Sequence, residues 1–142
     1  MTTLVDSFRT TLRGYLTYRG REGHLAFLLH RLTGLGTLLF LIIHIVDTSF
    51  VYFAPHLYGE TIALYQSTPF MIGEIFLVFS VIYHGVNGLR IAVVDMWLPH
   101  KWTLTAQKNW TRWAVVITIV LWLPAAVIMF RSMLIYNFGF GG

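Results

Sequence analysis

Three long apolar runs constrain the fold of this chain more than any other feature. They extend from about residue 25 to 46, from 70 to 96 and from 113 to 135. A helix of about 20 apolar residues crosses the roughly 30 Å hydrocarbon core of a bilayer. Only 11% of the residues are charged, against roughly 25% in a soluble domain. The sequence therefore predicts an all-α membrane protein, with three transmembrane helices in a single domain over residues 1–142.

The segments between the runs predict the orientation of the helices. Residues 1–24 are expected to form a cytoplasmic lead-in, either a short interfacial helix or a loosely structured segment, with no signal peptide. Residues 47–69 and 97–112 are expected to be loops. Basic residues gather before the first run and between the second and third, and residues 47–69 contain no lysine or arginine. Because positive charge stays on the cytoplasmic side, we expect a cytoplasmic N-terminus and an outside C-terminus.

Several classes of function are excluded by composition and motif. The chain has no cysteine, so it cannot supply a disulfide, a zinc–thiolate site or a cysteine-ligated iron–sulfur cluster. The formal charge of +4 comes from residues beside the apolar runs, which is not the basic patch of a nucleic-acid-binding protein. Metalloprotease, P-loop, dinucleotide-binding and serine-hydrolase motifs are also missing from the sequence.

An ionisable side chain, His84, lies inside the second apolar run. Polar residues at that depth are costly and are functional candidates by default, and neutral imidazole is a common metal ligand. Gly85 and Gly88 lie beside it and one turn away, leaving a recess that could admit a porphyrin or a closely packed helix. Arg90 follows about 9 Å further along the axis, within reach of a haem propionate or a lipid headgroup. A metal ligand and a packing face both remain possible from these residues.

The first run contains two histidines, His30 near its start and His44 near its end. They are fourteen residues apart, close to four whole turns, so they share one face of the helix. With the expected topology, His44 falls in the outer third of the membrane and His84 near its middle, roughly 14 Å apart along the normal. They are therefore not expected to ligate one iron. Each would need a histidine from another chain.

Two motifs resemble those of the cytochrome b membrane-anchor subunit of succinate dehydrogenase (complex II). His30-Arg31-Leu32-Thr33-Gly34 is similar to the family's first signature, in which His-Arg, a hydrophobic residue and Ser or Thr precede Gly. His84-Gly85-Val86-Asn87-Gly88-Leu89-Arg90 is similar to its second motif, a histidine, three residues, glycine, an aliphatic residue and arginine. The order and spacing of the motifs agree with this family over roughly residues 18–135.

The resemblance implies a haem b-binding anchor in the cell inner (plasma) membrane, helping to pass electrons from succinate to a quinone. It implies His84 as an axial haem ligand, His44 as the ligand of a second, outer haem, and His30, Arg31 and Arg90 beside propionates or the quinone. The haem, one or two, would be shared with a second small membrane-anchor subunit. An iron–sulfur subunit, a flavoprotein subunit and membrane lipid would be the other partners. The quinone, menaquinone or ubiquinone, and the oligomeric state of the complex are left open.

One departure from the family pattern concerns the quinone. Many relatives carry a serine four residues before the motif arginine, and here that position is Phe27. Phenylalanine cannot donate a hydrogen bond, so an altered, displaced or closed inner quinone site is expected. Two other hypotheses are kept: a haem-free structural anchor of the same type of complex, and a cytochrome b anchor of another dehydrogenase or hydrogenase.

Overall fold

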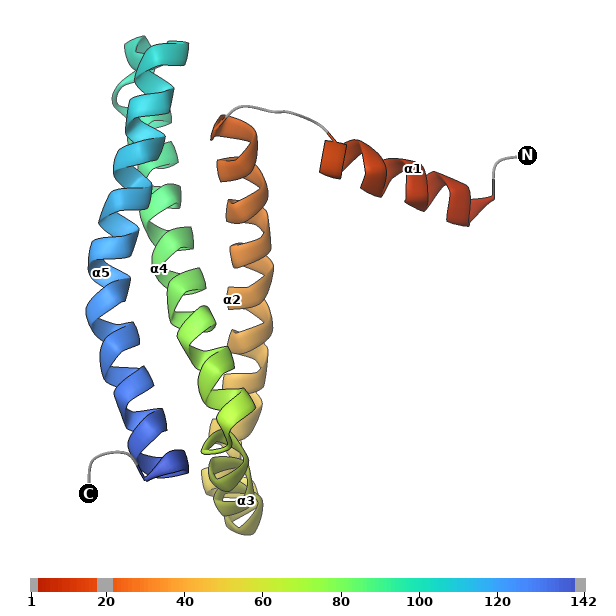
Figure 1. Ribbon diagram of the computed structural model, residues 1–142, viewed down its shortest axis with the longest axis vertical. Helices are drawn as coiled ribbons and strands as arrows, with labels where there is room; N and C mark the ends of the chain where they lie inside the picture. Colours follow the sequence, from red (N-terminus) through yellow and green to blue (C-terminus); the bar gives the residue numbers. More distant parts are fainter. Residues whose placement is uncertain (1–2, 18–21, 140–142) are drawn as a thin grey trace.

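The fold is a bundle of long helices. A computed structural model describes the chain at residues 3–17 and 22–139, and no strand occurs in these residues. In Figure 1, three helices run side by side along the long axis, and the first helix lies apart from them. The elements in chain order are α1 (Leu4–Thr17), α2 (Glu22–Phe53), α3 (Pro55–Tyr65), α4 (Thr68–Met96), the 3-10 helix η1 (Pro99–Lys101) and α5 (Leu104–Phe138).

In the described residues, three helices are long and apolar enough to span a membrane, which confirms the prediction of an all-α, three-span protein. They are α2 with 32 residues, α4 with 29 and α5 with 35. At about 1.5 Å per residue, each is longer than the roughly 30 Å of the hydrocarbon core. Their ends therefore extend beyond the apolar layer, further than the apolar runs alone indicated.

The prediction of a loop at residues 47–69 is wrong, because most of this segment is helical. Only Ala54 separates α2 from α3, and its φ of −153° and ψ of 70° break the helix. Pro55 then occupies the first turn of α3, where the missing N–H costs no intrahelical hydrogen bond. The Tyr65 hydroxyl donates to the Asp47 carboxylate and ties the end of α3 back to α2.

The loop expected at residues 97–112 is also shorter than predicted. The Thr103 side chain accepts a hydrogen bond from the backbone N–H of Ala106 at 3.3 Å and caps the start of α5. Residues 104–112 include good helix formers, so the helix begins before the apolar run does. Pro124 lies within α5, and Figure 1 shows this helix bowed along its length.

The lead-in contains a helix, α1, which was one of two possibilities left open for residues 1–24. Its first turn is closed by a reciprocal cap: the Thr3 hydroxyl accepts from the Asp6 N–H and donates to the Asp6 carboxylate at 2.6 Å. This hydrogen bond, and a second from the Thr3 backbone, hold the pKa of Asp6 below its usual range. Arg19 and Arg21, two of the basic residues that precede the first apolar run, lie outside the described residues.

The central helix of the bundle is α4, which packs against both α2 and α5. Several long-range hydrogen bonds link the helices. In two of them the Tyr83 hydroxyl donates to the Ala26 carbonyl at 3.2 Å, and the Trp122 indole N–H donates to the Ile75 carbonyl at 3.0 Å. Small side chains on the outer two helices let the backbones approach closely. The buried ones are Ala26 and Thr33 of α2 and Thr111, Ala114 and Thr118 of α5.

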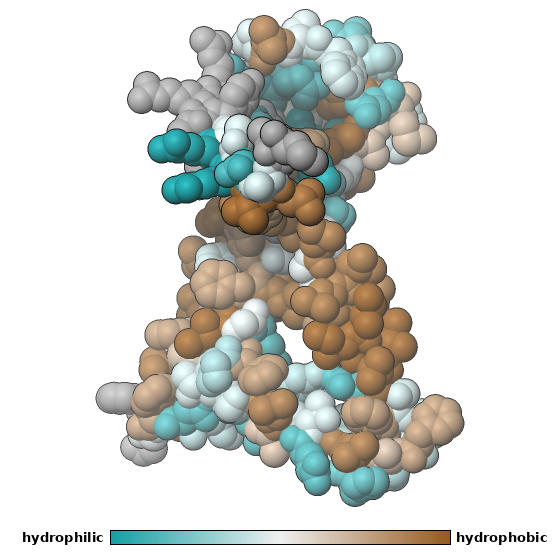
Figure 2. All heavy atoms as spheres, turned by 90° about the vertical axis from the view of Figure 1, so that its right-hand side faces the viewer, coloured by the Kyte–Doolittle hydropathy of each residue, from teal (hydrophilic) through white to brown (hydrophobic). Residues whose placement is uncertain are grey.

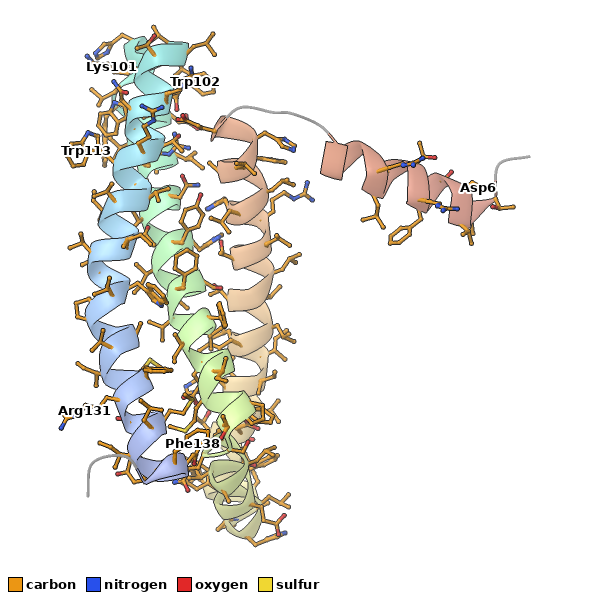
Figure 3. The ribbon with its side chains drawn as sticks, viewed as in Figure 1. Asp6, Lys101, Trp102, Trp113, Arg131 and Phe138 are labelled. Atoms are coloured by element: carbon orange, nitrogen blue, oxygen red, sulfur yellow. The ribbon has the colours of Figure 1, made fainter. Side chains whose placement is uncertain are left out.

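The surface is divided into an apolar middle and two ends that are more polar than the middle. Figure 2 shows hydrophobic side chains around the middle of the bundle and hydrophilic ones gathered toward both ends. Figure 3 places Lys101 and Trp102 at one end, and Arg131 toward the other. An interfacial tryptophan and charged residues outside an apolar band are typical of a bundle that spans a bilayer.

Candidate functional site

Two histidines meet between α2 and α4. The imidazole rings of His30 and His84 are stacked, with centroids 4.1 Å apart and planes within 2° of parallel. The Nδ1 atom of His84 lies 3.1 Å from the backbone carbonyl oxygen of His30. The structure therefore brings together two of the histidines that the sequence singled out, from motifs about fifty residues apart.

Each ring lies over a glycine of the opposite helix. A Cβ atom added to Gly34 would lie 2.8 Å from Cε1 of His84, and one added to Gly88 would lie 3.6 Å from Cε1 of His30. A Cβ added to Gly85 would meet nothing within 4 Å. The recess expected beside His84 is thus filled by the second histidine, and the glycine that seats the His84 ring is Gly34.

The contact with the His30 carbonyl determines which nitrogen of His84 carries a proton. A carbonyl oxygen only accepts, so Nδ1 of His84 is the donor and Nε2 keeps its lone pair. Among the described residues Nε2 has no hydrogen-bond partner, and it is not enclosed by the chain. Metal-ligating histidines usually hold their other N–H on a carbonyl or carboxylate in this way. The donor atom and its orientation thus fit an axial haem ligand.

The chain offers no complete metal site in its described part. No three His, Asp or Glu side chains gather there in a way that could hold a metal ion. A haem requires only axial ligands, because the porphyrin supplies the other four nitrogens. One histidine from this chain and one from a partner would be enough. The Nδ1 atom of His30 is buried and has no hydrogen-bond partner among the described residues.

His44 lies on the exposed surface of α2, away from the His30–His84 pair. Its ring stacks on Phe40 with centroids 5.3 Å apart. The His84 ring contacts the helix between His30 and Gly34, which are fourteen and ten residues from His44. At 1.5 Å per residue, His44 and His84 are about 15–21 Å apart along α2. One iron cannot bridge that distance.

Arg31 points away from the histidine pair, onto the exposed side of α2. Its Cζ atom lies 5.5 Å from the centroid of the Phe27 ring, within the range of a cation–π interaction. Both side chains are exposed. The phenylalanine that replaces the family's serine therefore lies under the motif arginine and leaves its guanidinium group accessible.

Arg90 faces α5 instead of the histidines. Its Nε atom donates to the Asn87 side-chain carbonyl at 2.9 Å, and Nη1 donates to the Gln107 side-chain carbonyl at 2.8 Å. Asn87 is 2% exposed, so this hydrogen bond is internal. Arg90 also lines a cavity of about 550 Å³ with Trp102 and Lys108, at the end of the bundle where α4 and α5 meet. The contact between Gln107 and Arg90 was not predicted, because an isolated glutamine between two apolar runs matches no sequence motif.

Residues 9–127 match the model of a family described as the succinate dehydrogenase/fumarate reductase transmembrane subunit. The chain belongs to this family. A similar protein is the succinate dehydrogenase 2 membrane subunit SdhC of Mycobacterium tuberculosis, 31% identical over 80 residues. That match covers 56% of this chain and 59% of the relative, so it spans little more than half of either protein.

Family membership confirms the resemblance found in the two motifs. Together with the three spans, it makes the chain a multi-pass membrane protein of the bacterial plasma membrane, as a transmembrane subunit of the succinate dehydrogenase/fumarate reductase type. The matched region contains both histidine motifs, His44 and the Phe27–Arg31 pair. Family membership also argues against the hypothesis that this chain is a cytochrome b anchor of an unrelated dehydrogenase or hydrogenase.

Proposed function

We propose that this chain is a haem b-binding anchor of a succinate:quinone oxidoreductase, with its N-terminus in the cytoplasm. The observation that carries the proposal is the orientation of His84. Its Nδ1–H is held by the His30 carbonyl, and its Nε2 lone pair is free of hydrogen bonds in the described part of the chain. Gly34 seats the ring and fixes its position on α2. His84 would thus be the residue of this chain that holds the haem iron.

A bound haem supplies a one-electron carrier between the soluble subunits and the membrane quinone. The chain's own residues hold and orient it. His30 positions the His84 ring by stacking and by its carbonyl, and its Nδ1 atom, buried without a partner among the described residues, is the candidate contact for a propionate or a quinone oxygen. Arg31 and Arg90 face away from the histidine pair, so each would meet a propionate or a quinone oxygen outside it, as a charged hydrogen-bond donor. Gly88 lets the His30 ring lie against α4.

The proposal requires partners. A second small membrane-anchor subunit would supply the other histidine, because His30 and His84 stack face to face and cannot bind one iron from opposite sides. An iron–sulfur subunit and a flavoprotein subunit deliver electrons from succinate on the cytoplasmic side. The quinone, menaquinone or ubiquinone, binds near Arg31, where Phe27 provides an apolar wall in place of a hydroxyl donor.

The test is the haem spectrum of the purified complex with His84→Ala. We expect the reduced-minus-oxidised signal of a bis-histidine haem b to disappear while the complex stays assembled. His100→Ala is the matched control, because His100 is exposed on η1 and remote from both motifs; it should leave the signal intact. An unchanged spectrum in the purified His84→Ala complex would exclude the assignment.

A haem-free structural anchor is a second candidate, and the packing of the histidine pair favours it. The His30 ring already fills the recess over Gly88, and the His84 ring fits against Gly34, so the two helices pack without a cofactor. In that case the purified wild-type complex would lack haem absorption and His84→Ala would only loosen the α2–α4 contact.

A further inference from the structure

The polar and apolar residues of α1 occupy different sides of the helix. At about 100° per residue, Leu4, Val5, Phe8 and Leu12 fall within an arc of about 100°. Thr10 lies on the opposite side. The four apolar side chains are 90%, 72%, 67% and 44% exposed. They form an apolar face, here called the α1 face, that the described part of the chain leaves uncovered.

Basic side chains border the α1 face. Arg9 lies about 40° beyond Val5 around the helix, and Arg13 about 40° further. The one acidic residue of α1, Asp6, lies about 100° beyond Val5 around the helix, further from the α1 face than either arginine. The charge at the edge of the α1 face is therefore positive, which complements an anionic surface.

The connection to α2 keeps α1 close to the bilayer. Thr17 and Glu22, the facing ends of α1 and α2, are five residues apart and so at most about 17 Å from each other. Because α2 is a membrane-spanning helix, its first residues lie near the membrane surface. In Figure 1, α1 runs across the bundle axis instead of along it, as a helix lying in the membrane plane would.

We propose that α1 lies on the anionic phospholipid surface of the membrane, with the α1 face in the boundary between headgroups and acyl chains. Aliphatic and phenyl side chains bordered by arginine suit this boundary, where carbon enters the acyl layer and guanidinium groups contact phosphate. A site on a soluble protein subunit is the competing possibility. The lipid surface is favoured because the α1 face has no side-chain polar atom, and because the short connection keeps it within reach of the bilayer.

The chain has no cysteine, so a single spin label can be placed without altering other residues. The experiment compares Phe8→Cys, on the α1 face, with Thr10→Cys on the opposite side as the matched control. The full chain is reconstituted in nanodiscs of zwitterionic lipid, with or without phosphatidylglycerol. Collisions of each label with oxygen, which concentrates in acyl chains, and with a water-soluble nickel complex report its depth.

We expect the label at position 8 to be accessible to oxygen and protected from nickel, and the label at position 10 to show the reverse. Phosphatidylglycerol should increase the immersed population at position 8. Arg9→Gln should reduce that population, relative to the water-exposed one, by about fivefold in anionic lipid. Equal nickel access at both positions would overturn the proposal. So would protection that develops only when soluble subunits are added, or immersion that is indifferent to lipid charge.

Discussion

The imidazole rings of His30 and His84 lie parallel across the α2–α4 interface, 4.1 Å apart, and the His30 backbone carbonyl accepts the Nδ1–H of His84. His30 therefore positions the His84 side chain in two ways. The stacked ring fixes the plane of the His84 imidazole, and the carbonyl fixes its tautomer. Both effects leave Nε2 of His84 with its lone pair, as the proposed role in binding haem iron requires.

Gly34→Ala should displace the His84 ring, because the new Cβ would lie 2.8 Å from Cε1 of His84. Losing the orienting contact of a metal-ligating histidine lowers metal affinity by about 10-fold or more, so haem content should fall on that scale. Gly36→Ala is the matched control, since its Cβ would make only an ordinary contact, 3.8 Å from the Ser80 hydroxyl oxygen. Haem per complex is the measurement. Full haem in Gly34→Ala would show that Gly34 does not position the ligand.

His44→Ala should lower the haem content from two per complex to one. The expectation rests on the exposed position of the His44 ring and on its distance from His84, about 15–21 Å along α2. His84→Ala should remove the other haem alone, and His56→Ala, an exposed histidine on α3, should remove neither. Quantitative haem extraction from each purified complex decides the matter. A wild-type complex with one haem, indifferent to His44, would contradict this prediction.

Arg31→Leu should impair quinone reduction more than electron transfer from succinate to a soluble artificial acceptor. The guanidinium group is exposed beside Phe27, and a hydrogen bond from a charged donor stabilises by about 1.5–3 kcal/mol. Its loss should slow quinone reduction about 10- to 100-fold. Arg131→Leu, near the end of α5, is the control. Equal losses in both assays would indicate failed assembly instead.

The N-terminus should be cytoplasmic and the C-terminus outside, as the distribution of basic residues predicts. Ser7→Cys and Tyr136→Cys introduce single thiols at exposed positions near the two ends of the chain. In intact cells, a membrane-impermeant maleimide should label position 136, and position 7 should react only after permeabilisation. The opposite pattern would reverse the orientation.

The sequence by itself determined that α2, α4 and α5 are membrane-spanning helices, because apolar length is a local property that does not depend on packing. It also identified the family, since both histidine motifs are contiguous stretches of chain. It misjudged residues 47–69, where polar and aromatic residues without an apolar run still form helix on either side of Ala54. Helix continuation there depends on local backbone hydrogen bonds and on the Tyr65–Asp47 contact, which hydropathy does not register.

Only the tertiary structure decided which residues of the facing helix His30 and His84 contact. The sequence placed Gly88 one turn from His84 and suggested a recess there, but the rotation of α4 against α2 puts His30 over Gly88 and His84 over Gly34. The same rotation turns Arg90 toward Gln107 on α5. Helical periodicity shows which residues share a face, whereas the facing partner depends on the packing of small residues such as Ala26 and Thr33 between helices.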